Sequence, residues 1–307
     1  MTATSVTPTS MMRTLFPLFA GASLLLGFTV AYGQSGGSAL HGADVGFGKG
    51  SVSTYVVLDD DGNPSVIGAR FDAEGLDAPP EGHSNLKYCT DRNSDGTVDQ
   101  PAECVMTHEF VVPMPDEVAA RDDIPFKWVL LNWNPMGHIP PGIYDSPHFD
   151  VHFMIEPVDS IFAIETGPCG PEFVRCDQFD VAKRPLPVNY KHPDFQDVEA
   201  VVPAMGNHLI DVTGPEFQGE PFTRSWIYGI YDGRVTFYEE MLTMNYLKSK
   251  PGICNPIKRT PAVGVSGFYP TTSCVGYDEA TGAYTVSMEG FEYREAEDPV
   301  MAEATAE

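Results

Sequence analysis

The chain has 307 residues and is strongly acidic, with 18 lysines and arginines against 43 aspartates and glutamates and a formal net charge of −25. This charge disfavours nucleic acids and anionic membranes as partners, because both carry charge of the same sign. Two interpretations of the charge stay open: a surface that keeps the protein soluble in a salty habitat, or carboxylates gathered to bind cations.

Residues 1–33 have the pattern of a secretory signal peptide. Arg13 supplies the positive charge, the stretch from Leu15 to Val30 is apolar, and Ala31-Tyr32-Gly33 forms a small-x-small cleavage site. The apolar stretch is short for a bilayer span, and no cysteine lies at the cleavage site to carry a lipid. We therefore predict a secreted or periplasmic protein with no membrane span after cleavage. A retained N-terminal anchor is the alternative.

The mature chain begins with a Gly- and Ser-rich stretch, which predicts a flexible lead-in at 34–50 before a β domain at 51–294. The runs 51–58 and 64–71 flank an Asp-Asp-Asp-Gly-Asn turn and predict a hairpin. Further strands are predicted at 105–112, 126–133, 147–153, 222–231, 234–240, 263–269 and 284–288. Another at 200–212 is broken at Met205-Gly206, so that His208 follows a bend.

Few helices are indicated, a short one at 159–164 and an optional one at 239–248. The stretch 167–195 is rich in proline and predicts a long surface loop. Acidic residues and alanines predict a disordered tail at 295–307. The expected fold is mainly β: a single β-barrel or β-sandwich domain with long loops and few short helices.

Six cysteines in an exported chain predict disulfide bonds, and fifteen pairings are formally possible. We favour pairs that are neighbours in the sequence, because each brackets a turn-rich segment that a disulfide would hold closed. A zinc site is disfavoured, since no two cysteines have the close spacing that such sites use. The predicted pairs are Cys89 with Cys104, Cys169 with Cys176, and Cys254 with Cys274.

The segment between Cys89 and Cys104 has the pattern of a calcium loop, with oxygen ligands at alternate positions and Gly96 at the sharp turn. It departs from an EF-hand, because Ala102 takes the place of the bidentate glutamate and no helices flank the loop. A plain acidic turn held by a disulfide is the alternative. The predicted ligands are Asp91, Asn93, Asp95, the Thr97 carbonyl and Asp99.

The strand predicted at 147–153 carries the strongest functional signal. Alternation sends His148, Asp150 and His152 to one face and apolar side chains to the other. Strand residues i and i+4 lie about 13 Å apart, whereas i and i+2 lie about 6.6 Å apart and can share an ion. We therefore expect one or both neighbouring pairs to join a later histidine and a carboxylate of the late hairpin. The predicted set is His148, Asp150, His152, His208 and Glu239.

Imidazole and carboxylate ligands suit zinc, iron, manganese or copper, and the pattern does not choose among them. A second interpretation has the same histidines hydrogen-bonded to Tyr144, Tyr228 or Asp211 in a polar seam. His138 lies in the Pro-rich segment 134–145, where we predict a donor that fixes the loop and not a ligand.

Several motifs occur together across residues 52–269: the turn at 59–64, Trp133 to His138, Gly142 to Phe153, Met205 to His208, and Ile227 to Gly233. They resemble an uncharacterised family of exported bacterial β proteins, one member of which belongs to an envelope-stress sigma-factor system of a thermophile. The resemblance implies a β-rich fold and assembly into homo-oligomers. It transfers no catalytic residue, because the family has no assigned activity. The cysteine pairs and the calcium-like loop are departures from it.

A more distant similarity is to cupin barrels, in which a His-x-His strand and a later histidine after a Pro/Gly turn hold a metal. This chain departs from that pattern, because Asp150 and two apolar residues separate the histidines and the segment 203–208 only approximates the second motif. The similarity therefore concerns architecture and not membership.

No His-Glu-x-x-His and no phosphate loop occurs in the sequence, which disfavours the common metalloproteases and nucleotide enzymes. The leading hypothesis is an exported metal-binding β protein whose His/carboxylate pocket binds a small molecule or performs metal-assisted chemistry. The alternative is a non-catalytic envelope-stress or oligomeric assembly module that disulfides and calcium stabilise. Whether the protein is an enzyme stays open.

Overall fold

The computed structural model describes residues 1–2, 39–100 and 102–302. All strands and helices below belong to one compact unit, Ser35–Glu307. The predicted signal peptide, apart from its first two residues, lies outside the described residues. Within those residues, no helix is long and apolar enough to cross a bilayer.

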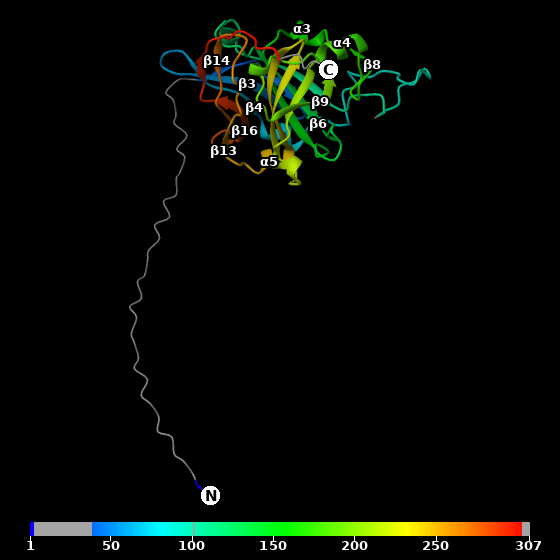
Figure 1. The fold of residues 1–307 in the computed structure, drawn as a ribbon. Helices are drawn as coiled ribbons and strands as arrows, with labels where there is room; N and C mark the ends of the chain where they lie inside the picture. The colour runs from blue at the N-terminus through cyan, green and yellow to red at the C-terminus, as the bar shows by residue number, and fades with distance from the viewer. Residues whose placement is uncertain (3–38, 101, 303–307) are drawn as a thin grey trace. The chain divides into compact units, whose positions relative to one another are not determined.

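The first sheet has seven antiparallel strands. They are β1 (Leu40–His41), β2 (Val45–Phe47), β3 (Gly50–Leu58), β4 (Pro64–Phe71), β13 (Ile253–Pro256), β15 (Thr272–Asp278) and β16 (Ala283–Glu289). Their order is β1-β3-β4-β16-β15-β13, with β2 also paired to β3. The early hairpin β3–β4 therefore pairs with strands from the end of the chain, as Figure 1 shows for β3, β4 and β16.

The second sheet also has seven antiparallel strands. They are β5 (His108–Pro113), β6 (Trp128–Asn134), β7 (His148–Met154), β9 (Phe195–Val202), β10 (Gly206–Asp211), β11 (Arg224–Tyr231) and β12 (Arg234–Thr243). Their order is β5-β6-β7-β12-β11-β10-β9. The central position of β7, between β6 and β12, explains why each of its residues is buried.

The remaining elements are short. They are α1 (Ala73–Asp77), α2 (Asp116–Ala119), α3 (Val158–Phe162), β8 (Thr166–Cys169), α4 (Cys176–Ala182), η1 (Val188–Tyr190), η2 (Pro215–Gln218), α5 (Met244–Lys248), β14 (Gly267–Tyr269) and β17 (Glu292–Arg294). The last two pair with each other as a small separate sheet. The helix predicted at 159–164 corresponds to α3. The first half of the optional helix at 239–248 is strand β12, and its second half is α5, which begins at Met244.

The two large sheets pack face to face over one apolar core. Phe149 of β7 lies with its ring 5.4 Å from that of Phe71 in β4 and 5.6 Å from that of Phe47 in β2. Val151 and Phe153 point into the same core and are fully buried. Within the described residues neither sheet closes on itself, so the prediction of a mainly β fold is confirmed in its β-sandwich form.

The boundaries of the ordered domain differ from those predicted. Strands β1 and β2 lie inside the predicted flexible lead-in, and Phe47 is fully buried because it packs in the core between the sheets. At the other end, the carbonyls of Glu297 and Val300 accept hydrogen bonds from the Tyr190 hydroxyl and the Val188 amide. The prediction of a disordered tail is therefore wrong for residues 295–300, and residues 303–307 lie outside the described chain.

The strand predicted at 200–212 with a break at Met205-Gly206 is a hairpin of β9 and β10, with its turn at Pro203 to Met205. Gly206 opens β10 at a φ of +101°, and a Cβ there would lie 2.6 Å from the Ile230 carbonyl oxygen. Glycine satisfies both constraints, because it lacks a Cβ and tolerates positive φ. This turn sets the position of His208.

All three predicted disulfides are confirmed: Cys89–Cys104, Cys169–Cys176 and Cys254–Cys274. The last joins directly opposed residues of β13 and β15 in the first sheet. The other two lie in the connections that cover the second sheet. No free cysteine is present in the described chain.

A buried ion pair within the second sheet is hydrogen-bonded to the first sheet, and it gives the first prediction. Arg224 donates to both carboxylate oxygens of Glu240 at 2.7 and 2.8 Å, and Ser273 of the first sheet donates to the same carboxylate at 2.6 Å. Glu240→Gln leaves the guanidinium buried without a counter-charge and should lower the free energy of unfolding by about 3–5 kcal/mol. Urea denaturation at neutral pH measures this.

The matched control is Glu165→Gln, which breaks an ion pair with Arg175 whose side chains are 58% and 47% exposed. That change should cost about 0–1 kcal/mol. Equal losses in the two variants would contradict the importance given to the buried pair.

Candidate metal centre

The candidate site lies on the outer face of the second sheet, the face turned away from the core between the sheets. Alternation along β7 places His148, Asp150 and His152 there, and all three are buried. Loops cover this face: Tyr144 of the 135–147 connection packs with Met241 of β12, and other apolar side chains of the cover pack on Leu130 and Phe237. The site is therefore enclosed between a sheet and its covering loops.

One cluster on this face consists of His152, His208 and Glu239, which we name the Glu239 cluster. Glu239 lies directly opposite His152 in the β7–β12 pairing, and His208 comes from β10, two strands beyond β12. His152 Nε2 lies 3.6 Å from Glu239 Oε1, and His208 Nε2 lies 3.9 Å from Glu239 Oε2. One potential ligand atom from each residue lies within 4.8 Å of the others.

Backbone carbonyls orient both imidazoles. His152 Nδ1 lies 3.0 Å from the Leu130 carbonyl oxygen, and His208 Nδ1 lies 2.8 Å from that of Ala200. A carbonyl oxygen only accepts, so the proton of each neutral ring is on Nδ1 and the lone pair is on Nε2. Both lone pairs are therefore available on the nitrogens nearest Glu239, as in histidines that ligate metals.

No side chain of the Glu239 cluster carries a positive charge near pH 7. Burial lowers the pKa of His152 to about 4 and that of His208 to about 3, so both are neutral near pH 7. Burial, with the nearby charges of Asp150 and Glu240, raises the pKa of Glu239 well above its ordinary value. His152 Nε2 and Glu239 Oε2 are buried and have no hydrogen-bond partner within the described residues. This is an arrangement that a bound cation would complete.

An aromatic ring supports the two imidazoles from one side. The Phe237 ring lies 4.9 Å from that of His152 and 5.2 Å from that of His208, both edge to face or nearly so. Phe237 pairs with Gly229 of β11, and the absence of a side chain at Gly229 makes room for the ring. The close packing of Phe237 on Gly229 thus sets the spacing of both histidines.

A second cluster, which we name the Asp150 cluster, consists of His138, His148 and Asp150. His138 Nε2 lies 3.2 Å from Asp150 Oδ2, and His148 Nε2 lies 3.2 Å from Asp150 Oδ1. The Asn134 amide donates to Oδ2 at 2.6 Å. One potential ligand atom from each of the three residues lies within 4.8 Å of the others.

In contrast to the Glu239 cluster, the Asp150 cluster contains an ion pair, between His138 and Asp150. Burial opposes protonation of His138, but the carboxylate of Asp150 outweighs it and raises the pKa of His138 to about 9. Burial alone would raise the pKa of Asp150, but its neighbouring histidines lower it well below the ordinary value. Near pH 7 the pair is therefore an imidazolium and a carboxylate.

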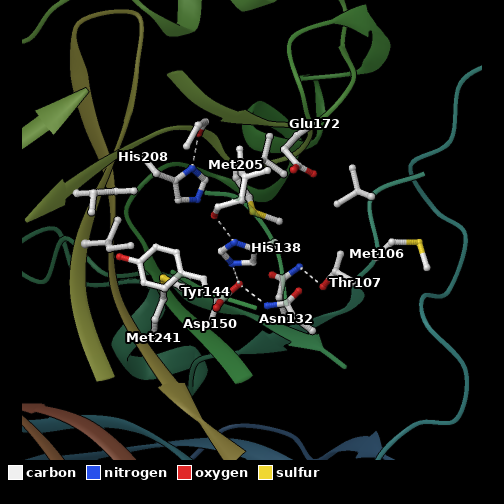
Figure 2. A pocket seen from close by; sticks show the side chains of 17 residues that line it. Met106, Thr107, Asn132, His138, Tyr144, Asp150, Glu172, Met205, His208 and Met241 are labelled. Carbon is white, nitrogen blue, oxygen red and sulfur yellow. Dashed lines mark hydrogen bonds and ion pairs between the residues drawn. The ribbon is translucent and has the colours of Figure 1, made fainter. Parts of the chain in front are cut away.

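A cavity of about 40 Å³ contacts both clusters. Figure 2 shows His138 and Asp150, joined by their ion pair, in the same pocket as His208. Most of the other lining side chains are apolar. The polar exceptions include Thr107, Asn132, Asn134 and Glu172. A wider hollow of about 230 Å³ shares His138 and Glu172 with the cavity and lies beside it. The cavity volume is enough for a few water molecules.

The structure thus places all five predicted ligands on one face but divides them between two clusters. The sequence interpretation missed His138, which does bond to its own loop through the Ile139 carbonyl but also contacts Asp150. The signal in the sequence was that His138 lies in the loop that leads directly into β7, the strand that carries three of the other ligands. The predicted seam partners are wrong: the histidine Nδ1 atoms contact backbone carbonyls and not Tyr144, Tyr228 or Asp211.

The acidic loop at 91–99 closes on itself. Both carboxylate oxygens of Asp91 accept backbone N–H groups, from Asp95 and Gly96, and Glu103 accepts those of Arg92, Asn93 and Asp99. These bonds explain the turn without an ion. Calcium binding by this loop stays a prediction.

A third group of potential ligands, Cys254, Cys274 and Glu289, lies in the first sheet. It is not a candidate metal site, because the two cysteines form a disulfide and no thiolate is available.

Comparison with known proteins adds no constraint on this site. No family model, no curated protein and no solved structure matches the chain. The description of the protein therefore rests on its own geometry. It is a β-sandwich protein with histidine and carboxylate groups positioned for metal binding.

The packing of Phe237 on Gly229 gives the second prediction. A Cβ at Gly229 would lie 2.0–2.2 Å from three atoms of the Phe237 ring, so Gly229→Ala must displace the ring and with it both imidazoles. We expect about a 10–100-fold loss of metal affinity, measured by competition with a chelating dye, and a stability loss of about 1–3 kcal/mol. The control is Gly46→Ala, where nothing lies within 4 Å of the added Cβ. Unchanged affinity in Gly229→Ala would refute this role of the ring.

The lowered histidine pKa values give the third prediction, for the metal-free protein. Unfolded histidines take up protons near pH 6.5, whereas His152 and His208 do so in the folded state only near 4 and 3. Their contribution to stability is therefore present above about pH 6.5 and is lost as the pH falls. Glu239, with its raised pKa, acts in the opposite direction above about pH 4.5.

Between pH 6.5 and 4.5 the unfolded chain binds two more protons than the folded chain at the histidines and one fewer at Glu239, a net difference of one proton. Stability should fall by about 1.4 kcal/mol per pH unit from pH 6.5 to 4.5 in chelator. Urea midpoints at several pH values measure this slope, and His208→Asn should flatten it. His41→Asn, at an exposed position of β1, is the control. A slope that survives in His208→Asn would show that this histidine is not its source.

Proposed function

We propose that this protein is an exported metal-binding protein in which His152, His208 and Glu239 hold one transition-metal ion. The observation that carries the proposal is the Glu239 cluster, in which two neutral imidazoles and a buried carboxylate surround a common point. Its His152 Nε2 and Glu239 Oε2 lack hydrogen-bond partners in the part of the chain that is described.

The spacing of the cluster supports an ion at its centre. Two ligands bound tetrahedrally at about 2.1 Å lie about 3.4 Å from each other. The observed 3.6 and 3.9 Å are too long for good hydrogen bonds but close to this value. A divalent cation also provides the positive charge that the Glu239 carboxylate lacks, and it needs the histidines neutral.

Two imidazoles and one carboxylate suit zinc, iron, manganese or copper. Three protein ligands leave a coordination position open, as in catalytic zinc sites and in 2-His-1-carboxylate iron sites. His208 lines the cavity, so water or a small ligand there can approach the ion. This supports metal-assisted chemistry on a small molecule as the role of the site.

Export is supported by the three disulfides, because such bonds persist in oxidising compartments. The predicted signal peptide at residues 1–33 supports it independently. A secreted or periplasmic location follows from the two together as part of the proposal.

The fourth prediction tests the proposed centre. Protein produced without a histidine tag, stripped with chelator and reloaded, should lose one metal equivalent per chain in His208→Ala and in Glu239→Gln. Elemental analysis after gel filtration measures this, and His41→Ala is the control. Metal should raise the melting temperature of the wild type but much less that of the two variants. Unchanged metal content in both variants would overturn the proposal.

A second candidate function is a non-catalytic envelope-stress or assembly module, which the family resemblance suggests. The small size of the cavity favours it, since about 40 Å³ holds water molecules but not an organic substrate in this conformation. A stable homo-oligomer in light scattering, together with well-folded protein that neither contains nor is stabilised by transition metals, would favour this second function.

A further inference from the structure

We propose that His138, His148 and Asp150 bind a second metal ion, so that the outer face of the second sheet holds two neighbouring metal sites. This goes beyond the proposed function, because the second site uses none of the ligands of the first.

Two unsatisfied buried atoms point to a ligand in the Asp150 cluster. His148 is fully buried, and Asp150 is nearly so. His148 Nε2 and Asp150 Oδ1 are 3.2 Å apart, yet neither has a well-formed hydrogen bond to any described residue. Such atoms are costly to bury without a partner. A cation between them and His138 would satisfy both.

The histidines of the Asp150 cluster are oriented like those of the Glu239 cluster. His148 Nδ1 lies 2.6 Å from the Ser146 carbonyl oxygen, and His138 Nδ1 lies 2.7 Å from that of Ile139. Each ring therefore uses Nδ1 on the backbone and turns Nε2 to the carboxylate. The same construction occurs at all four histidines of this face, as expected where backbone carbonyls fix metal ligands.

The carboxylate of Asp150 is also held in place. Asn134 of β6 donates to Oδ2 at 2.6 Å, which leaves Oδ1 free to face His148. Hydrogen-bonded carboxylates of this kind are common among metal ligands, because the second contact fixes their orientation. Asn134 is thus a positioning residue for the second site.

The two sites have separate ligand sets. His138, His148 and Asp150 form one group of mutually close ligand atoms, and the Glu239 cluster forms another, with no residue in common. Both sites nevertheless reach the same cavity, since His138 and Asp150 line it together with His208. A water-sized ligand in the cavity can therefore contact either ion.

The second site should be the weaker one. Without a metal, Asp150 is already paired with His138, and an incoming ion must compete with that pair. The Glu239 cluster contains no such pair. His138 is 27% exposed and lines the wider hollow beside the cavity, which gives the ion a route to the site.

The fifth prediction uses zinc as the probe. Chelator-stripped protein is titrated with zinc, and bound zinc is counted by elemental analysis and by calorimetry. Wild type should bind two equivalents of unequal affinity. His138→Ala and His148→Ala should each bind one, with the weaker event lost, and His208→Ala should bind one, with the stronger event lost. His41→Ala should bind two.

The outcomes separate the two proposals. If wild type binds one equivalent that His208→Ala abolishes and His138→Ala leaves unchanged, the second site is wrong and the first stands. If His138→Ala abolishes the bound zinc and His208→Ala does not, the first is wrong and the second stands. No bound zinc in wild type overturns both. His138 is a partly exposed loop residue, so its variant remains informative if His148→Ala fails to fold, which near-ultraviolet circular dichroism would reveal.

Discussion

The buried carboxylate of Glu239 is the constraint on which the functional face depends. It lies in the middle of a sheet and under a cover of loops, and both nearby histidines are neutral. A carboxylate in such a place must take up a proton or receive a cation. The arrangement of His152 and His208 around it, with both Nε2 atoms toward the carboxylate, positions these three groups for metal binding.

The neighbouring carboxylate of Asp150 meets the same constraint differently. Its charge is balanced by His138, and its orientation is fixed by Asn134. The two carboxylates on this sheet face thus differ in how their negative charge is accommodated: Asp150 has an imidazolium beside it, whereas Glu239 must take up a proton or receive a cation. The short distance between them raises the pKa of Glu239 further, so the two clusters influence each other electrostatically.

The cover over this face is held partly by covalent bonds. Cys89–Cys104 ends directly before Val105 to Thr107, which line the cavity, and Cys169–Cys176 brackets Glu172, which lines both the cavity and the hollow beside it. Asn132 of β6 donates to Thr107 at 3.0 Å and ties the cover to the sheet. Two of the three disulfides therefore support the site, while the third joins strands of the opposite sheet.

The sequence by itself determined what depends on local geometry. Alternation along β7 put His148, Asp150 and His152 on one face and Phe149 in the core, and turn residues marked the β3–β4 and β11–β12 hairpins. Only the tertiary structure decided which histidine meets which carboxylate. The β7–β12 register sets Glu239 opposite His152, the β9–β10 turn positions His208, and the path of a loop brings His138 to Asp150. The β7–β12 pairing joins strands far apart in the chain, and the loop that carries His138 has no repeating pattern, so alternation along β7 alone does not reveal which side chains meet its histidines and carboxylate.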